Sequence, residues 1–390
     1  AFYYASEYVA VPGTKLVIRG EYPRARYASF NVYDALNRPL DGLADVNIQA
    51  LPGSTNPFVV GNDRNASPRE YEIEIRFEPK PASPAPNTIY AGEGQPVGAN
   101  RPPNFSGLIL YRIYLPDPGA DDQGDVGLPR VSIVADAVDA SVDLPGDEAC
   151  AQFRELPASG LDAAARQADF PKELRPLLPR TPGQNPPVWH PFRAFNTALG
   201  QLFFENDLLA PIGGPEIARA IPPLGSGGFL SNIDNDYMYT AANLAYGDVL
   251  VIRGKAPTFP DTSTATTMPA GDVRYWSICS NDPYSTRFIA CLFDADVELD
   301  ADGSYTIVLS PQDVKPADAT NWIAWGPQHS NAVIYRQMLP DSGSSQSLRT
   351  CLRSLPNENA QDPNVIDCMG DYAPTATYCS LADFEAGSCP

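Results

Sequence analysis

Residues 3–23 read YYASEYVAVPGTKLVIRGEYP, and residues 237–257 read YMYTAANLAYGDVLVIRGKAP. Both stretches contain the pentapeptide LVIRG, which begins at Leu16 in the first half of the chain and at Leu250 in the second. A short apolar run that ends in a charged residue and a glycine is typical of a strand before a turn. The repeat therefore predicts two copies of one β-rich domain.

The likeness between the halves continues beyond these two stretches and keeps the same order along the chain. Chance rarely produces so many collinear matches, so we infer an internal duplication. The further matches are RYAS at 26–29 with RYWS at 274–277, DVNI at 45–48 with DVEL at 296–299, YEI at 71–73 with YTI at 305–307, NTI at 87–89 with NWI at 321–323, and LPD at 115–117 with LPD at 339–341.

Each copy contains short segments rich in valine, isoleucine, tyrosine and phenylalanine, separated by proline, glycine, asparagine and aspartate. In YEIEIRF, at 71–77, apolar and charged residues alternate, which is the pattern of a half-buried strand. We therefore expect a mainly β fold, with an antiparallel β-sandwich or jelly roll in each copy. The predicted strands lie at 15–19, 28–33, 71–77, 108–114, 249–252, 304–309 and 332–335.

The region between the copies has a different pattern. Helical signals fall at 159–178 and 191–210, with Pro191 in the first turn of the second helix, where proline is tolerated. The proline-rich stretch 178–189 is expected to be extended. The apolar residues that would share one face of the second helix are Phe192, Phe195, Leu199, Leu202 and Phe203.

These patterns divide the chain into four expected parts. The first β-sandwich repeat covers 1–145, and a helical, proline-rich insert that packs across both sandwiches covers 146–230. The second repeat covers 231–345. A C-terminal tail stabilised by disulfides covers 346–390.

Four segments of the second copy, taken in order, resemble the β-sandwich family of unknown function called DUF1214. The resemblance implies a jelly-roll-like sandwich and implies no reaction, and the first copy follows the pattern more loosely. The sequence departs from the family where IAWG, at 323–326, replaces LPAP. As a whole, the chain also resembles uncharacterised secreted proteins. The four segments are VRYWS at 273–277, DGSYTI at 302–307, NWIAWG at 321–326 and VIYRQMLP at 333–340.

Charge and hydropathy exclude several classes of protein. The chain has 390 residues, of which 47 are acidic and 27 basic, giving a net charge of −20. Nucleic acids and anionic membranes are bound by basic surfaces, so neither is an expected partner. No stretch approaches the roughly 20 apolar residues of a membrane-spanning helix.

The cysteines indicate an oxidising compartment. No Cys-x-x-Cys motif occurs, and the two histidines lie at no ligand-like spacing, so a disulfide framework is favoured over a metal centre or haem. The chain starts at Ala1, which we interpret as a mature N-terminus after removal of a signal peptide, and hence as a secreted or cell-surface protein. We expect the last six cysteines to pair in sequential order. Cys150 would then be either a buried free thiol or part of an intermolecular disulfide. The expected pairs are Cys279–Cys291, Cys351–Cys368 and Cys379–Cys389.

Three arginines recur in both copies, each in or beside an apolar strand. Such a guanidinium could bind an oxyanion, but the recurrence favours a structural role in the fold. The expected ion pairs share an eight-residue spacing. The recurring arginines are Arg19 with Arg253, Arg26 with Arg274 and Arg112 with Arg336; the expected ion pairs are Arg26–Asp34 and Arg274–Asp282.

Two acidic clusters are candidate cation sites. The loop DPGADDQGD at 117–125 offers carboxylates of the kind that calcium binds, although its spacing differs from that of an EF-hand. The carboxylates at 294–302 alternate and would share one face of a strand; a solvated face is the simpler interpretation. The candidate calcium ligands of the first loop are Asp117, Asp121, Asp122 and Asp125.

Catalytic signals are sparse. No Gly-x-Ser-x-Gly elbow is present, and a serine hydrolase would have to use His190, before the predicted helix, or His329, in a predicted turn. Trp276, Trp322 and Trp325 are expected to fill the core rather than to stack on sugars. The glycosylation acceptor pattern occurs at Asn65 and at Asn104.

We therefore expect a secreted, non-catalytic protein with a structural or binding role at the cell surface, in the matrix or in an extracellular assembly. Carbohydrate binding is one form of this role, and self-association through an open sheet edge at the N-terminal strand is another. The alternative hypothesis is an extracellular hydrolase or lyase that acts on a polysaccharide or lipid in a cleft between the repeats. No catalytic or ligand-binding residue is assigned, and calcium is the one cofactor considered.

Overall fold

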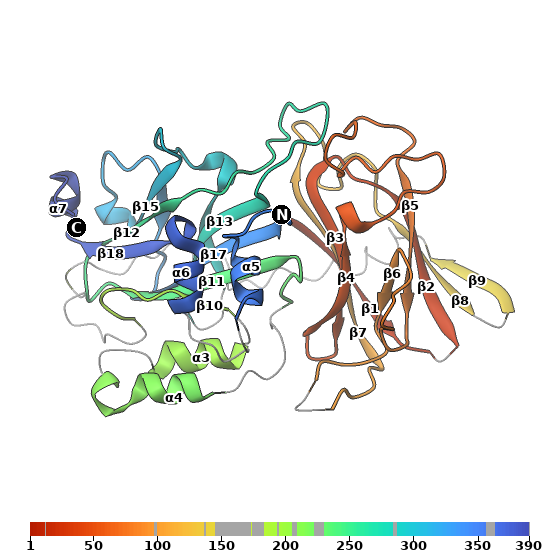
Figure 1. Cartoon of the computed structure of the whole chain (residues 1–390), viewed down its shortest axis with the longest axis horizontal. Coiled ribbons are helices and arrows are strands. Elements are labelled where there is room, and N and C mark those ends of the chain that lie inside the picture. The colour runs from red at the N-terminus through yellow and green to blue at the C-terminus, as the bar shows by residue number, and fades with distance from the viewer. Residues whose placement is uncertain are drawn as a thin grey trace. The chain divides into compact units, whose positions relative to one another are not determined.

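The computed structural model describes residues 1–11, 13–96, 100–135, 138–144, 173, 183–192, 195–204, 209–221, 230–283, 287–355 and 363–389. The chain forms two compact units, each with two β-sheets (Figure 1). Unit 1 comprises Ala1–Pro157, Leu224–Asp234 and Pro260–Ala270, and unit 2 comprises Ala158–Pro223, Asn235–Phe259 and Gly271–Pro390.

Unit 1 is a sandwich of two sheets. The β3 sheet has the strand order β1-β7-β3-β4, and the β2 sheet has the order β6-β5-β2-β8-β9. All neighbours in the two sheets are antiparallel except β5 and β6. The strands are β1 (Phe2–Val9), β2 (Thr14–Glu21), β3 (Ala25–Asp34), β4 (Pro39–Ala44), β5 (Glu70–Arg76), β6 (Thr88–Tyr90), β7 (Ser106–Pro116), β8 (Arg130–Ala135) and β9 (Val138–Leu144).

Unit 2 is also a sandwich. Its β13 sheet has the order β10-β11-β17-β13-β14, and its β12 sheet has the order β16-β15-β12-β18. The strands are β10 (His190–Pro191), β11 (Asn235–Asn243), β12 (Val249–Lys255), β13 (Val273–Asn281), β14 (Phe288–Phe293), β15 (Ser304–Ser310), β16 (Trp322–Ala324), β17 (Ser330–Pro340) and β18 (Thr375–Cys379).

The two units repeat one topology, which confirms the expected duplicated sandwich fold. The order β1-β7-β3-β4 in unit 1 corresponds to β11-β17-β13-β14 in unit 2, and β6-β5-β2-β8 corresponds to β16-β15-β12-β18. The two LVIRG segments lie in β2 and β12, each of which pairs with a strand on both sides. The only additions to the shared pattern among the described strands are β9 and β10.

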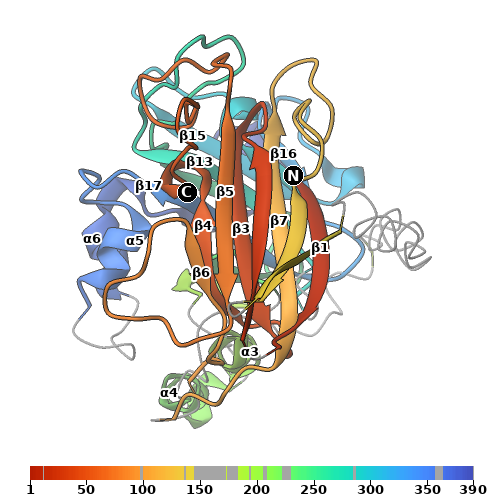
Figure 2. The same ribbon diagram turned by 90° about the vertical axis from the view of Figure 1, so that its right-hand side faces the viewer.

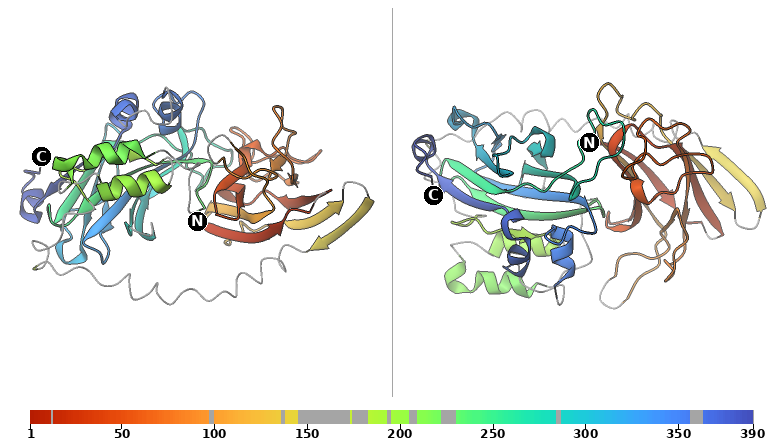
Figure 3. Two further views of the ribbon diagram at one scale, coloured as in Figure 1. Left: turned by 90° about the horizontal axis from the view of Figure 1, so that it is seen from below. Right: turned by 45° about the horizontal axis from the view of Figure 1, so that its top comes forward.

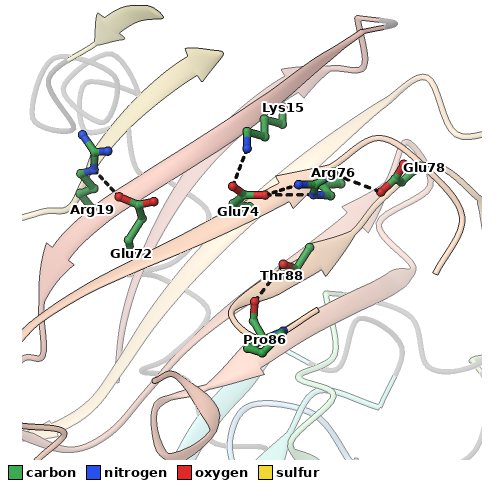
Figure 4. A network of polar contacts seen from close by, with 8 residues as sticks. All are labelled: Lys15, Arg19, Glu72, Glu74, Arg76, Glu78, Pro86 and Thr88. Atoms are coloured by element: carbon green, nitrogen blue, oxygen red, sulfur yellow. Dashed lines mark hydrogen bonds and ion pairs between the residues drawn. The ribbon is translucent and has the colours of Figure 1, made fainter. Parts of the chain in front are cut away.

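The alternation in the predicted strand 71–77 is confirmed by β5. Its apolar residues Tyr71, Ile73 and Ile75 are buried in the core of unit 1. The charged residues on the opposite face form a ladder with β2 (Figure 4), in which Lys15 Nζ lies 2.5 Å from Glu74 Oε1 and Arg19 Nε lies 2.5 Å from Glu72 Oε2.

The corresponding face of the β12 sheet is apolar. Val249, Val251 and Val308 are buried there beneath Leu381 and Phe384 of helix α7 (Leu381–Glu385). The disulfide Cys379–Cys389 joins β18 to the segment just beyond this helix. The outer face of the β2 sheet in unit 1 therefore carries charged side chains, whereas the corresponding face of the β12 sheet in unit 2 is apolar and is covered by helix α7.

The C-terminal tail is part of the second sandwich rather than a separate part of the chain. It contributes β18 to the β12 sheet, and helices α5 (Leu348–Arg353) and α6 (Pro363–Met369) pack into the core of unit 2. All three expected disulfides are present: Cys279–Cys291 bridges β13 and β14, Cys351–Cys368 bridges α5 and α6, and Cys379–Cys389 closes the tail. Cys150 lies outside the described residues.

The expected insert is only partly described. Residues 159–178 lie outside the described part of the chain, apart from residue 173. The second helix exists as α3 (Phe195–Phe204), beside α4 (Gly214–Ala220), and both belong to unit 2 (Figure 3). Pro191 is not in its first turn, because His190 and Pro191 form the short strand β10 against β11. Helix α3 packs on β11, where Tyr239 contacts Ala198.

Unit 1 incorporates two segments from later in the chain. Residues 230–234 bind its β3 sheet, with Tyr33 Oη donating to Ser231 O at 2.9 Å and Asn232 Nδ2 donating to Tyr27 Oη at 2.8 Å. Within 260–270, Met268 N donates to Asn62 O at 2.9 Å. The boundaries of the units therefore differ from the four consecutive parts expected from the sequence.

The sequence comparison aligned residues 45–48 with 296–299, but the structure aligns them two residues earlier in the second copy. Asp45 Oδ2 accepts from Ala28 N at 2.7 Å, and Asp294 Oδ2 accepts from Trp276 N at 3.0 Å, so Asp45 corresponds to Asp294 rather than to Asp296. Residues 294–296 form a 3₁₀ helix, not a strand. The acidic residues at 294–302 therefore do not share one strand face as the alternation suggested.

Candidate functional site

The loop that follows β17 begins at the repeated tripeptide LPD. Leu339 has a φ of +43°, in the left-handed region, and its counterpart Leu115 in unit 1 has a φ of +51°. The turn redirects the chain so that Asp341 N donates to Asp272 O at 2.8 Å. The Asp341 side chain then accepts from Gly343 N at 2.8 Å, which closes a tight turn. Both copies therefore leave the sheet in the same way.

A buried amide fixes the far end of this loop. Gln337 of β17 is 1% exposed, and its Oε1 accepts from Leu348 N at 2.8 Å while its Nε2 donates to Tyr335 Oη at 2.8 Å. Ser347 caps helix α5 by accepting from Thr350 N. A side-chain cap of this kind satisfies a helix N–H that has no partner within the helix. The loop 341–347 is therefore held at both ends.

The loop borders a cleft of about 140 Å³. On the other side of the cleft lies Asp272, just before β13, whose Oδ2 accepts from Thr258 Oγ1 at 2.6 Å. Ser344 Oγ donates to Asp272 O at 2.9 Å and lies 3.5 Å from Asp272 Oδ1. The cleft is lined by Pro257, Asp272, Val273, Gln337, Gly343, Ser344, Ser345, Gln346, Ser347 and Tyr372.

The polar groups of this lining are hydroxyls, amides and one carboxylate, and Pro257, Val273 and the ring of Tyr372 add apolar surface. Serine hydroxyls and the glutamine amide both donate and accept hydrogen bonds. Gln346 is exposed, and its Nε2 donates to Met369 O at 3.3 Å. Lys255 Nζ lies 5.7 Å from the centre of the Tyr372 ring. The cleft can therefore offer hydrogen bonds to a polar ligand, and one aromatic side chain is part of its lining.

The same place in unit 1 is occupied by charged side chains. Asp117 N donates to Arg24 O at 2.9 Å, as Asp341 N does to Asp272 O. Arg64, which is 4% exposed, forms an ion pair with Asp117 there. Burial raises the pKa of Asp117, although the Arg64 guanidinium acts in the opposite direction. The two copies have therefore diverged at this loop, with an internal ion pair in unit 1 and a cleft in unit 2.

The structure does not assemble the expected calcium site. Asp117 is paired with Arg64, whereas Asp121 and Asp125 bond each other's backbone: Asp121 Oδ1 accepts from Asp125 N at 2.9 Å, and Asp125 Oδ1 accepts from Asp121 N at 3.0 Å. Asp122 accepts at its carbonyl from Tyr4 Oη at 3.0 Å. Within the described ranges, no three residues among histidine, cysteine, aspartate and glutamate are placed to hold a metal ion.

The two expected ion pairs are wrong, because each would join residues at opposite ends of one strand. Arg26 is near the start of β3 and Asp34 is its last residue, so eight residues at about 3.3 Å each separate them. Asp34 instead pairs with Arg38, with Nη2 and Oδ2 2.7 Å apart. Arg274, near the start of β13, is separated in the same way from Asp282, which follows the last residue of that strand.

The recurring arginines Arg112 and Arg336 have corresponding partners in the two units. Arg112 of β7 lies opposite Tyr3 of β1, with its guanidinium 5.8 Å from the ring centre, and Arg336 of β17 lies opposite Tyr237 of β11 at 5.3 Å. These distances are those of a cation–π contact. Arg112 Nη2 also donates to Leu230 O at 2.6 Å. The interpretation of a repeated structural role thus gains support at this pair.

The remaining candidates are engaged in local packing. His190 is 5% exposed, with Nδ1 3.2 Å from Gln201 Nε2 and its ring beside Tyr239. His329 lies in a bend directly before β17, as expected. Trp276 and Trp325 are fully buried in the core of unit 2, which confirms their expected role, and Trp322 is half-buried with Lys315 Nζ 4.9 Å from its ring.

The two glycosylation acceptors differ in accessibility. Asn104 is 8% exposed, and its Nδ2 donates to Tyr8 Oη at 2.8 Å and to Ala91 O at 2.9 Å. Asn65 is exposed, and its Oδ1 accepts from Arg24 at 2.9 Å. Only Asn65 therefore presents its amide to solvent.

No family model and no curated protein matches the chain. Among solved structures, an uncharacterised protein from Burkholderia cenocepacia is similar at 14% identity, over 97% of this chain and 82% of the other, with a TM-score of 0.45. The VPA0106 protein from Vibrio parahaemolyticus is similar at 11% identity, over 97% and 88%, with a TM-score of 0.39. None of the described helices is both long enough and apolar enough to cross a membrane.

Proposed function

We propose that this chain is a secreted, non-catalytic binding protein whose cleft in unit 2 holds one sugar unit of an extracellular glycan. The observation that carries the proposal is the lining of the cleft: Asp272, Ser344 and Gln346 offer hydrogen-bonding groups, and Tyr372 offers a ring. Sugars present hydroxyls around an apolar ring face, so convergent polar groups beside an aromatic side chain complement them.

The size of the cleft limits what it can take. Its volume of about 140 Å³ lies below the roughly 300–1,000 Å³ that is usual for drug-sized ligands. A terminal sugar or one branch of a chain suits this volume, and the rest of a glycan would extend into solvent. The proposal therefore concerns recognition of a chain end or a branch.

The composition of the lining also favours binding over hydrolysis. A glycosidase of the usual kind needs two carboxyl groups that flank the scissile bond. Among the described residues that line the cleft, Asp272 is the one carboxylate, and it is already bonded to Thr258. A sugar bound here would lack the second acid.

Secretion is supported by the three disulfides. Such bonds persist in oxidising compartments and are rare where thiols are kept reduced. Cys351–Cys368 and Cys379–Cys389 hold the elements that complete unit 2, including β18. The loop of the cleft immediately precedes α5, which carries Cys351.

A glycan array followed by titration calorimetry tests the proposal. We expect the full chain to bind a defined set of neutral glycans, and we expect Gln346→Ala and Ser345→Ala each to weaken the best of them by about tenfold, the effect of losing roughly 1.4 kcal/mol of binding free energy. Ser345→Trp should abolish binding, because the indole fills the cleft. Gln312→Ala, an exposed glutamine elsewhere in unit 2, is the matched control and should bind as the wild type does.

Two results would contradict the proposal. One is the absence of binding across an array that covers common terminal sugars. The other is binding that Ser345→Trp leaves unchanged, which would place the glycan elsewhere. Release of reducing ends from a polysaccharide by the wild type would instead favour the hydrolase alternative.

A further inference from the structure

The first strand of the chain is an edge strand with a free side. In the β3 sheet, β1 pairs with β7 on one side, and no described strand pairs with it on the other (Figure 2). Phe2, Tyr3 and Val9 are 40%, 54% and 69% exposed, and Glu7 is the one charged residue of the strand. Natural edge strands are usually protected by proline, lysine, a bulge or a covering segment.

The other edge of the same sheet is protected. Strand β4 begins with Pro39, whose carbonyl accepts from the side chain of Gln95. Asp41 in the middle of β4 accepts from Tyr90 N at 2.9 Å and pairs with Lys80 at 2.6 Å. Within the described residues, the β4 edge of this sheet is therefore covered by other parts of unit 1, whereas the β1 edge is open.

The corresponding edge in unit 2 already accepts a strand. Strand β11 corresponds to β1, and the outer side of β11 pairs with β10, with His190 opposite Tyr239 and Pro191 opposite Met238. Because Tyr237 corresponds to Tyr3, Tyr239 and Met238 correspond to Ala5 and Tyr4. The duplicated fold thus binds an added strand at the centre of this edge.

The hydrogen-bonding pattern between β1 and β7 determines which residues of β1 have backbone groups that point away from β7 and can pair with another strand. Ala10 N donates to Phe105 O at 2.8 Å, in register with the pairing of β1 and β7. In an antiparallel pair, the backbone groups of successive residues point to alternate sides. Those of Ser6 and Tyr8 therefore point to β7, and those of Ala5 and Glu7 point to the open side.

Of the antiparallel registers that this pattern allows, the one centred on Ala5 brings the smallest side chain of β1 to the two-fold axis. Outward-pointing residues pair with each other, so a two-fold axis that places Ala5 opposite Ala5 places Tyr3 opposite Glu7 and Tyr4 opposite Ser6. The small alanines meet at the axis, and each Glu7 faces a tyrosine rather than the other Glu7. Like charges opposite each other would oppose pairing, and this register has none.

An apolar slot lies beside the same residues. It measures about 40 Å³ and opens between β1 and the β2 sheet at the edge of the sandwich. It is lined by Tyr4, Ala5, Ser6, Ile18, Phe30, Ile109, Tyr111, Leu128, Pro129 and Val131. A strand added to β1 would extend the β3 sheet across this slot and remove it from water, which is favourable for apolar surface.

We infer that two copies of this chain associate through antiparallel pairing of their β1 strands about a two-fold axis at Ala5. The two β3 sheets become one continuous sheet, and each copy covers the apolar slot of the other. The inference concerns unit 1 and does not depend on the cleft of unit 2. Because each copy carries a net charge of −20, the dimer is expected to strengthen as salt screens the repulsion.

Light scattering after size-exclusion chromatography gives the first test. The full chain at tens of micromolar is expected to run at about 84 kDa, twice its 42.1 kDa, and more completely at high salt. Ala5→Pro removes an outward N–H that β7 does not use, and should leave a monomer. A wild type that stays at the mass of one chain under all these conditions overturns the inference.

Cross-linking gives a second test that does not depend on the proline variant folding. Cα atoms across a hydrogen-bonded antiparallel pair lie about 5.5 Å apart, within the usual range for a disulfide. Ala5→Cys is therefore expected to form a covalent dimer under mild oxidation. Ser6→Cys is the control, because Ser6 faces Tyr4 of the second copy and its side chain points to the other face. A dimer that Ala5→Cys fails to cross-link, or that Ala5→Pro leaves intact, places the interface elsewhere and overturns the inference.

Discussion

Gly254 lies directly opposite Tyr305 in the ladder between β12 and β15, and the tyrosine side chain crosses the space where a side chain of residue 254 would lie. A Cβ at this position would approach Tyr305 Oη to 2.6 Å. Gly20 and Tyr71 repeat the arrangement in unit 1, with an approach of 2.8 Å. The glycine of each LVIRG segment is therefore required by a tyrosine on the neighbouring strand.

Gly254→Ala is expected to destabilise unit 2 by about 1–3 kcal/mol, the usual effect of overpacking a core. Tyr305 Oη is buried and makes no hydrogen bond among the described residues, so Tyr305→Phe alone should change stability little. The double variant should recover part of the loss, since the hydroxyl that meets the new Cβ is gone. Denaturant unfolding of the four proteins measures this coupling, and strictly additive effects would contradict the contact.

Glu74→Gln should make stability less dependent on pH in the acid range. Burial raises the pKa of Glu74, but hydrogen bonds from Lys15 and Arg76 outweigh it and hold the pKa below its usual value. A carboxylate with a lowered pKa stabilises the fold above its unfolded pKa of about 4.3, and this contribution is lost as pH falls through the lower folded value.

The wild type should therefore be more stable than Glu74→Gln at neutral pH, and this difference in stability should decrease below about pH 4.3. Melting temperatures between pH 3 and 7 give the comparison. Glu70→Gln, which removes an exposed carboxylate from the same strand, is the control. The result to watch is the difference in melting temperature between Glu74→Gln and the wild type. If this difference stays constant from pH 3 to 7, the charged ladder in Figure 4 does not hold the Glu74 carboxylate in its charged form.

Removal of the Cys351–Cys368 bridge should destabilise unit 2 by about 3 kcal/mol, because the bridge closes a loop with a sequence separation of 17. The variant Cys351→Ala/Cys368→Ala also leaves a space in the core around α5, since Cys351 is fully buried. Chemical denaturation gives the change in free energy. A midpoint equal to that of the wild type would mean that the two helices are held by packing alone.

Arg64→Leu should destabilise unit 1 more than Arg64→Leu/Asp117→Leu does. The single change leaves the partly buried Asp117 without its cation, and breaking such a pair costs up to about 3–5 kcal/mol when the site is dry. The double change removes both members of the ion pair. Equal losses for the two variants, measured by denaturant unfolding, would show that Arg64 acts through packing and not through its charge.

The order of the repeats was enough to predict the fold class, because most of the matches fall on strands whose place in the sheet is shared. LVIRG marks the central strands β2 and β12, and YEIEIRF marks β5 by its alternation. The disulfides followed sequential pairing because each joins neighbours in the chain, such as β13 and β14 of one hairpin.

Long-range pairing left no local signal. Nothing in residues 375–379 indicates that they complete the β12 sheet, and nothing in 260–270 indicates that Met268 bonds Asn62 of unit 1. The arginine–aspartate pairs failed because sequence spacing was interpreted as proximity within an extended strand. The cleft could have been suspected from the repeated LPD, which is followed by unlike loops, but its other wall at Asp272 appears only in three dimensions.

A crystal structure of the full chain with its best-binding glycan tests the proposed role most directly. We expect a sugar ring seated against Tyr372, with its hydroxyls bonded to Asp272 and to the loop at Ser344 and Gln346. A glycan bound at any other surface, with this cleft left empty at saturating concentration, would contradict it.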